Sequence, residues 1–402
     1  MKGAIEPKRA GRDDHPLNHS NPELVDLIRG QIARAGPVTF AWFMEQALYH
    51  PQHGYYASGR ARLGRHGDYF TNVSVGPVFG RLLARQIAEI WAAAGRGTPF
   101  TIVEQGAHDG QLAADVLAAL AADAPECFDH AQYRIVEPFQ PLRARQADRL
   151  RQFSSRIRWS NSLGEMEPFT GVHISNELLD AMPVHVCVRR RSCDERDAWL
   201  ELHVDWQDDS FTFCDGPISD RQIEHWLHRM PDVPAGFQLE INLSAIGWLG
   251  ELSAKLQRGS ALIIDYGILR QDLLLRARGG TLQFRSQHRI LDSPFAHIGN
   301  CDITAHLDWN AIATQAIDGG LDIVGFADQH HFLSGILSVY PDTVTSSDQA
   351  TGRQLQTLLH PEILGRSFQV LGLCRGLTTD FRLSGFRFAR DPVERLGLDR
   401  SR

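Results

Sequence analysis

Short apolar runs alternate with helical patterns from about residue 100 onward, and this alternation restricts the chain to a small set of folds. The clearest run is Ser260–Tyr266 (SALIIDY), which is apolar on both faces, as in a strand buried in the middle of a parallel sheet. Between two such runs, Leu112, Val116 and Leu120 recur every fourth residue, as expected of a helix. The pattern predicts an α/β fold, with a parallel sheet and helices on both of its faces.

The rest of this sheet follows from similar apolar runs along the chain. The further strands that we predict are Phe100–Glu104, Tyr133–Glu137, Arg156–Ser160, Gly171–Ser175 and Asp322–Phe326. After the last of these strands, the sequence predicts two helical stretches, one on either side of His360–Pro361.

The strand-helix rhythm is interrupted once, and this interruption divides the chain into regions. We predict that residues 184–235 form an inserted region of antiparallel strands and helix. Its strands form a meander at Val184–Arg190, Trp199–Asp205 and Ser210–Cys214. The α/β core is therefore predicted to comprise residues 99–183 and 236–402, with a polar stretch at 270–300 that we interpret as a long loop or lid. Residues 1–20 are predicted to be a flexible arm, and 21–98 a helical region with a glycine-rich loop.

Composition narrows the classes of partner and location. The formal net charge of −7 disfavours a nucleic-acid partner, because phosphate backbones repel an acidic surface. The first residues have no apolar signal core, and no apolar run is long enough to cross a membrane. The cysteines form no C-x-x-C pair, although a bond between Cys187 and Cys193 is left open. We expect a cytoplasmic protein with no membrane partner, and a homodimer is compatible with the sequence.

The first chemical motif is Glu104-Gln-Gly106-Ala-His108-Asp-Gly110, which follows a predicted strand and opens a helix. Glycines at such a turn let the backbone approach a ligand, and the helix start leaves N–H groups free. A dinucleotide fingerprint requires G-x-G-x-x-G, and its third glycine is absent here. The spacing fits the E/D-x-G-x-G-x-G turn of methyltransferases better, with His108 either narrowing the pocket, contacting the ligand or replacing a glycine without effect.

The second motif is Glu137, at the end of the next predicted strand. The two oxygens of a carboxylate match the two hydroxyls of a ribose, so this residue is a candidate for ribose binding. It lies further from the glycine turn than in a typical dinucleotide site. The alternative interpretation is a surface glutamate at a strand end.

The third motif is Asn176-Glu177-Leu-Leu-Asp180, directly after another predicted strand. A carboxylate here could orient a nucleophilic nitrogen or pair with a guanidinium through two hydrogen bonds. The alternative is that Asn176 caps a following helix and Glu177 complements its dipole.

Two other stretches have weaker chemical signals. Gly67 and Asp68 lie in the glycine-rich loop, which we expect to fold over a bound cofactor. Asp302, His306 and Asp308 have a spacing that matches no common metal motif, and we therefore predict no metal site.

Taken in order, these motifs resemble the MidA and mitochondrial complex I assembly methyltransferase family. The resemblance extends over roughly residues 21–380 and includes the His53-Gly54-Tyr55-Tyr56 stretch, Gly67–Thr71, Asn176–Pro183, Asp265-Tyr266-Gly267 and Asp302–Trp309. It implies a class I S-adenosylmethionine (SAM)-dependent methyltransferase with a Rossmann-like sheet, acting on a protein substrate whose arginine is methylated in the mitochondrial relatives.

The resemblance also implies roles for particular residues. Gly106 and Gly110 would line SAM, Glu104 would lie near its methionine end, and Glu137 would hold the ribose. Asn161 and Ser162, after the third predicted strand, would lie near the adenine, with Gly67, Asp68, His108 and Asn176 as further cofactor contacts. Glu177 is the first candidate for binding the acceptor nitrogen, with Asp180 and Asp265 behind it.

Three other functions remain open from the residues alone. They are a small-molecule O- or N-methyltransferase, a non-catalytic assembly factor that keeps the fold, and an NAD-dependent dehydrogenase.

Overall fold

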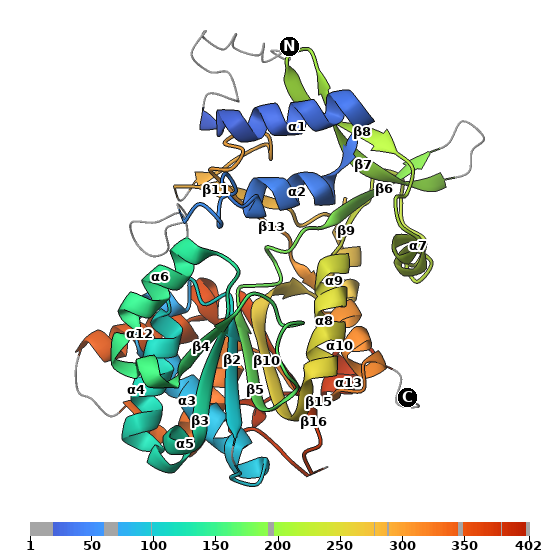
Figure 1. Cartoon of the computed structure of the whole chain (residues 1–402). Helices are drawn as coiled ribbons and strands as arrows, with labels where there is room; N and C mark the ends of the chain where they lie inside the picture. The colour runs from blue at the N-terminus through green and yellow to red at the C-terminus, as the bar shows by residue number, and fades with distance from the viewer. Residues whose placement is uncertain are drawn as a thin grey trace.

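An eight-stranded sheet runs through the centre of the protein, in the order β15-β16-β10-β5-β2-β3-β4, with β14 beside β10 (Figure 1). The structure, a computed structural model, describes residues 19–59, 71–97, 99–191, 197–276, 278–287, 289–344, 349–378 and 380–398. In this part of the chain, no helix is both long and apolar enough to span a bilayer.

Most strands of this sheet are parallel, as the sequence predicts. The mutually parallel strands are β2 (Phe100–Gln105), β3 (Ala131–Val136), β4 (Ile157–Ser160), β5 (Phe169–Asn176), β10 (Leu256–Ile268) and the short β14 (Leu307–Asp308). β16 (Phe368–Arg375) lies antiparallel between β10 and β15 (Asp322–Asp328).

The helical stretch predicted after His360–Pro361 is one short helical turn, Pro361–Gly365, and strand β16, which follows it, was not predicted. Phe368, Val370 and Leu371 are buried in the middle of the sheet. A short apolar run of this kind has no periodicity that separates a buried strand from a buried helix.

The order of the strands leaves a crevice at one place. From β2 the chain proceeds outward to β3 and β4, then returns to β5 on the other side of β2. The connections after β2 and β5 therefore leave the sheet in opposite directions. In open α/β sheets this switch point, at the carboxyl ends of the strands, is where ligands bind.

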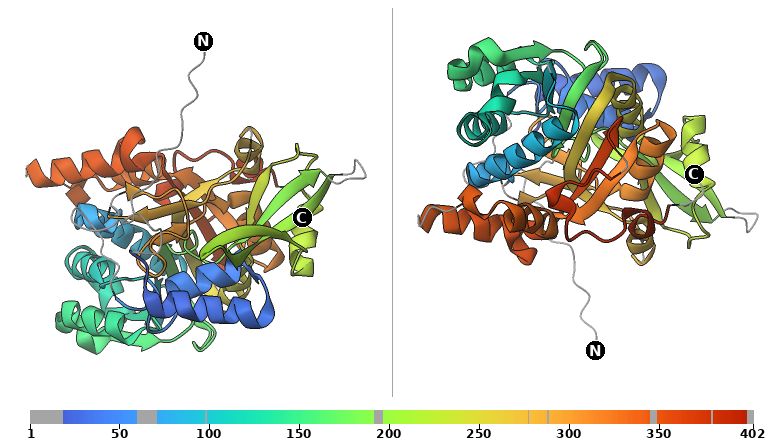
Figure 2. Two further views of the ribbon diagram at one scale, coloured as in Figure 1. Left: turned by 90° about the horizontal axis from the view of Figure 1, so that it is seen from above. Right: turned by 90° about the horizontal axis from the view of Figure 1, so that it is seen from below.

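Helices cover both faces of the sheet (Figure 2). On one face pack α3 (Val78–Ala93), α4 (Gln111–Asp123) and α11 (Gln329–Val339), and on the other α8 (Leu243–Lys255) and α10 (Trp309–Asp318). Neighbouring side chains of a strand point to opposite faces. Ile102 accordingly packs with α3 and α4, while Val103 packs with α8.

A second body lies over the carboxyl ends of the parallel strands, in the upper part of Figure 1. Its antiparallel sheet confirms the predicted meander and contains β1 (Val38–Thr39), β6 (His185–Arg191), β7 (Asp197–Gln207), β8 (Ser210–Gly216) and β9 (Gln238–Ile241). A three-stranded sheet adds β11 (Gln283–Ser286), β12 (Arg289–Ile290) and β13 (Asp302–Thr304).

The predicted 21–98 region is split between the two bodies. α1 (Pro22–Ala35) and α2 (Phe40–Tyr49) pack on the antiparallel sheet, where the Phe43 ring contacts those of Phe211 and Phe295. α3, in contrast, packs on the central sheet. Side-chain packing between distant segments decides this division, and local sequence signals do not report it.

The stretch at 270–300, interpreted from sequence as a long loop or lid, contains regular structure. It includes α9 (Arg270–Leu274), β11 and β12, and its Phe295 and Ile298 are buried in the second body. The remaining helices are α5 (Pro125–His130), α6 (Gln140–Arg149), α7 (Arg221–Leu227), α12 (Gln349–Leu359) and α13 (Pro392–Arg395). Most of the predicted arm, residues 1–18, lies outside the described residues.

Candidate active site

A cavity of about 370 Å³ opens at the switch point of the central sheet, within the size range of small-molecule sites. The segments that follow β2, β3 and β5 line this cavity, and the second body contributes Tyr49 and Tyr56. The residues that line it include Glu104–Asp109, Val136–Phe139, Asn176–Leu178, Tyr49 and Tyr56.

The turn after β2 has a left-handed backbone at three positions. Gly106 and Gly110 have φ angles of 82° and 83°, which glycine adopts without strain. His108 lies between them with φ 45°, although it has a Cβ. The histidine thus adopts the conformation that a glycine would favour, and such strain is concentrated at functional sites. Its side chain lines the cavity without filling it.

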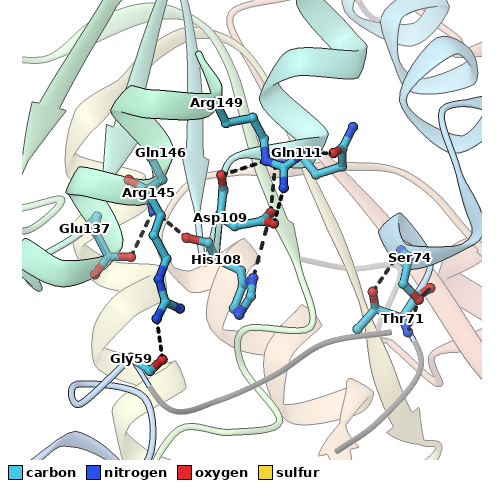
Figure 3. Close-up of polar contacts among 10 residues, drawn as sticks. All are labelled: Gly59, Thr71, Ser74, His108, Asp109, Gln111, Glu137, Arg145, Gln146 and Arg149. Atoms are coloured by element: carbon cyan, nitrogen blue, oxygen red, sulfur yellow. Dashed lines mark hydrogen bonds and ion pairs between the residues drawn. The ribbon is translucent and has the colours of Figure 1, made fainter. Parts of the chain in front are cut away.

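Helix α6 supports this turn from behind (Figure 3). The Gln146 amide donates to the His108 carbonyl at 2.9 Å. Arg149 donates from Nε to the Asp109 carbonyl at 3.1 Å and from its terminal nitrogen to the Asp109 carboxylate at 2.6 Å. Local sequence patterns do not predict these contacts, because they join residues 38 to 40 positions apart in the chain.

Glu104 is buried at the end of β2 and lines the cavity. Its Oε2 accepts a hydrogen bond of 2.6 Å from the Tyr133 hydroxyl on β3. Burial raises the pKa of Glu104 to about 7, and the tyrosine bond opposes this rise. A cationic ligand group beside the carboxylate would favour its ionised form.

Glu137 follows β3 and is also buried at the cavity. Its Oε1 accepts from the Phe139 backbone N–H at 3.0 Å, and its Oε2 accepts from Gln146 at 3.2 Å. A carboxylate can accept about four hydrogen bonds, so both oxygens keep capacity for a ligand hydroxyl. Burial raises the pKa of Glu137, while these hydrogen bonds lower it.

Asn161 and Ser162 do not line the cavity. Both are exposed at the end of β4. The Asn161 side chain is engaged on both sides, accepting from Arg143 at 2.7 Å and donating to Glu165 at 2.8 Å. Arg143 links Asn161 to the Glu137 carbonyl, so the end of β4 lies near the predicted ribose site without lining the cavity.

Asn176 and Glu177 lie on the cavity wall at the end of β5. Glu177 has φ 53°, a second strained backbone at this site. Its Oε1 accepts from the Asn176 amide at 3.0 Å, and the Asn72 backbone N–H also donates to the carboxylate. Asn176 caps no helix, because a turn follows it. Burial, assisted by the charge of Asp265, raises the pKa of Glu177 to about 8.

Asp265 lies fully buried behind this turn and does not reach the cavity. Its Oδ2 accepts from the backbone N–H groups of Leu178, Leu179 and Asp180, at 3.2, 2.8 and 3.4 Å. Its Oδ1 accepts from the Tyr266 N–H at 2.8 Å. Asp265 thus holds the segment that carries Glu177, which is a positioning task and not the catalytic one expected from the sequence.

Asp180 is buried beside Asp265 and also lies outside the cavity lining. Burial and the neighbouring Asp265 charge raise the pKa of Asp180 well above its usual range. The N–H groups around Asp265 favour its ionised form, so Asp180 is the partner that keeps a proton.

Asp302 is another buried acidic group near Glu177 and Asp180, and it comes from the second body. The Tyr56 hydroxyl donates to its Oδ1 at 2.6 Å, and the Tyr49 hydroxyl donates to the Ala181 carbonyl at 2.9 Å. The two tyrosine rings stack with centroids 5.5 Å apart. Within the described ranges, no group of three or more His, Cys, Asp or Glu side chains could hold a metal ion.

No lysine or arginine of the described residues forms an ion pair with Glu177, Asp180 or Asp265. Gly67 and Asp68, the predicted cofactor contacts of the glycine-rich loop, lie outside the described residues. The site therefore combines a cradle for a nucleoside-like ligand with an acidic group that faces the same cavity.

Comparison with known proteins identifies the ligand. A family model of S-adenosyl-L-methionine-dependent methyltransferases matches residues 82–327. The chain belongs to this family. It is 31% identical to a COG1565 superfamily member from Burkholderia thailandensis whose crystal structure contains S-adenosyl-homocysteine, with a TM-score of 0.82 over 95% of this chain and 98% of that one.

Curated relatives extend over nearly the whole chain. The human mitochondrial protein arginine methyltransferase NDUFAF7 is 27% identical, over 94% of this chain and 88% of its own length. The Drosophila melanogaster homologue is 24% identical, over 92% and 89%. The predicted family, the class I methyltransferase fold, the enzyme class and SAM as the cofactor are thereby confirmed.

The residues fit this cofactor by their chemistry. Glu137 offers paired acceptors for a ribose diol, Glu104 offers a buried carboxylate for an ammonium group, and Leu112, Phe139 and Leu142 provide apolar surface between them. The sequence analysis did not identify Asn72, Tyr49 or Gln146 as site residues. Tyr56 was noted only as part of a stretch that resembles the family, without a role in the site.

Proposed function

We propose that this methyltransferase modifies a protein, and that the acceptor is the guanidinium nitrogen of an arginine. The observation that carries the proposal is Glu177, a carboxylate on the cavity wall that has no basic partner among the described residues. A guanidinium is planar and permanently charged, and it pairs with a carboxylate through two hydrogen bonds. The names of the curated relatives support the same acceptor.

SAM supplies an electrophilic methyl group on a sulfonium when it is bound. The turn of residues 104–110 and Glu137 would bind its two ends and fix its orientation. Positioning is the main contribution that the protein makes to such a displacement, because the methyl group is already activated.

On the acceptor side, Glu177 would hold the guanidinium and direct one nitrogen toward the methyl group. Methylation of a guanidinium nitrogen breaks the S–CH₃ bond, forms an N–CH₃ bond and releases one N–H proton. The pKa of Glu177 is raised to about 8 in the ligand-free site, and a bound guanidinium would lower it and favour the ionised carboxylate, which can accept this proton. Asp265 holds the strained turn, and the stacked Tyr49 and Tyr56 rings also line the cavity.

Location and assembly remain predictions. We propose a cytoplasmic protein, and a homodimer remains compatible with the sequence. Cys187 is buried with a free thiol, and Cys193 lies outside the described residues.

A labelled transfer experiment tests the acceptor. The purified chain is incubated with methyl-labelled SAM and a cell extract, and the labelled protein is hydrolysed to amino acids. We expect the label in methylarginine. Label in lysine, histidine or a carboxyl ester would disprove the arginine acceptor.

The same experiment separates the alternatives. Label that passes an ultrafiltration membrane indicates a small-molecule methyltransferase. SAM binding without any transfer indicates an assembly factor that has kept the fold.

A further inference from the structure

Helix α6 places one polar side chain in a position that a helix normally fills with an apolar one. Leu142, Gln146 and Leu150 follow one another at intervals of four residues, and all three are buried. Gln146 is completely inaccessible to solvent. A buried amide costs free energy unless its hydrogen bonds are satisfied, so its partners show what it does there.

Two hydrogen bonds of the Gln146 side chain go to the part of the cavity that would bind the cofactor. This part, the turn at residues 104–110 together with Glu137, is called the cofactor wall below. The Nε2 atom donates to the His108 carbonyl at 2.9 Å and to Oε2 of Glu137 at 3.2 Å (Figure 3). The first bond fixes the strained residue of the glycine turn. The second fixes the rotation of the carboxylate that would bind the ribose.

The third bond anchors the amide itself. Its Oε1 accepts from the Trp159 indole N–H at 2.8 Å, and this bond determines which end of the amide carries the NH₂ group. Both hydrogens of Nε2 are therefore directed at the cofactor wall, one to each element. An apolar residue of the same length could fill the space but could hold neither element.

We propose that Gln146 is a positioning residue for SAM, which locks the turn at His108 and the Glu137 carboxylate in one fixed relative arrangement. Arg149 adds bonds to the same turn from the half-exposed surface, where water competes with them. The proposal depends on cofactor binding at Glu137 and is independent of the methyl acceptor.

Binding of S-adenosylhomocysteine to the purified full-length chain tests the proposal without any acceptor. We expect Gln146→Met to raise the Kd, measured by calorimetry, about tenfold or more, because two hydrogen bonds to the cofactor wall are lost. Gln140→Met is the matched control. Gln140 lies on the same helix and is exposed, so its change should leave the Kd within twofold.

Two further variants separate positioning from simple packing. Gln146→Glu keeps an acceptor for Trp159 but places a second carboxylate against Glu137, and it should bind at least as weakly as Gln146→Met. Trp159→Phe removes only the anchoring bond and should lose less affinity than either. In a double-mutant cycle, Glu137→Gln and Gln146→Met together should cost less than the sum of their separate effects, because they act through one contact.

Two results would overturn the proposal. One is a folded Gln146→Met protein that binds S-adenosylhomocysteine with wild-type affinity. The other is a Gln146→Glu protein whose affinity for S-adenosylhomocysteine and whose melting temperature both return to the wild-type values. Gln146 would then have a structural role only. If Gln146→Met does not fold, the Kd values of Gln146→Glu and Trp159→Phe are compared instead. A Gln146→Glu protein that binds S-adenosylhomocysteine as tightly as Trp159→Phe would overturn the proposal.

Discussion

The two walls of the cavity are built differently. On the cofactor wall, Glu104 and Glu137 each accept hydrogen bonds from neighbouring groups, and the strained turn is held by α6. The acceptor wall has Glu177 in front of Asp180 and Asp265, and the described residues offer these three groups no basic partner. The carboxylates of the cofactor wall are thus held by neighbouring groups, whereas no described lysine or arginine pairs with Glu177.

The origin of the residues also differs. The cofactor wall comes from the segments that follow the consecutive strands β2 and β3, and α6 follows β3 in the chain. The acceptor wall combines β5 and β10 with Tyr49, Tyr56 and Asp302 of the second body. A ligand common to the whole family can be bound by one local unit, and a specific acceptor requires contacts from both bodies. The following experiments test this division.

Glu177→Gln should have the largest effect. Loss of the charge that pairs with a buried guanidinium should lower labelled-methyl incorporation into protein by roughly 10²–10³-fold, as for a truncated buried charge pair. Calorimetry should show nearly unchanged binding of S-adenosylhomocysteine. Glu167→Gln, an exposed glutamate of the same core, is the control. If Glu177→Gln weakens the binding of S-adenosylhomocysteine as much as it lowers methyl incorporation, the proposed division between the two walls is incorrect.

Glu137→Gln should affect the opposite wall. One oxygen becomes an amide that cannot accept from a ribose hydroxyl, so the Kd of S-adenosylhomocysteine should rise by about tenfold. At saturating SAM, transfer should recover most of its rate. A rate that stays low at saturation would show that Glu137 also acts on the acceptor.

Tyr56→Phe should have a smaller effect, confined to the acceptor. The change removes the 2.6 Å hydrogen bond to Asp302, and the KM for the methylated protein should rise by about threefold, as for one neutral hydrogen bond. Tyr340→Phe, at a tyrosine that does not line the cavity, serves as the control. An increase in the KM for SAM instead would place Tyr56 on the cofactor side.

The pH dependence of stability should show the smallest effect. In the ligand-free protein, the pKa of Glu177 is raised from 4.5 to about 8, so the unfolded chain releases this proton at lower pH than the folded one. Wild-type stability therefore falls relative to Glu177→Gln as the pH rises from about 5 to about 8, and the difference levels off above that. Melting curves across this range should separate by a few degrees. A separation that does not change with pH would mean that Glu177 is ionised throughout.

Local patterns were sufficient for part of the fold and of the site. Asn21 and Thr39 precede α1 and α2, and their side chains accept from the N–H groups of Leu24 at 3.0 Å and of Trp42 at 3.2 Å, as capping residues do. Glu104, Gly106, Glu137 and Glu177 became candidates because each lies at or just after the end of a predicted strand, and parallel strands bring their carboxyl ends to one edge. Asn161 follows a strand as well, yet it lies away from the cavity.

The parallel sheet, the glycine turn and the family could be predicted from the amino-acid order, because these depend on residues close together in the chain and on their periodicity. The packing of α1 and α2 on the antiparallel sheet, the support of the turn by Asp265 and the exposure of Glu177 to the cavity emerge from the folded arrangement alone. The same holds for the hydrogen bonds of Gln146 to the cofactor wall. Such roles depend on which side chains meet across long separations, and a buried glutamine or aspartate has the same appearance in the sequence as an exposed one.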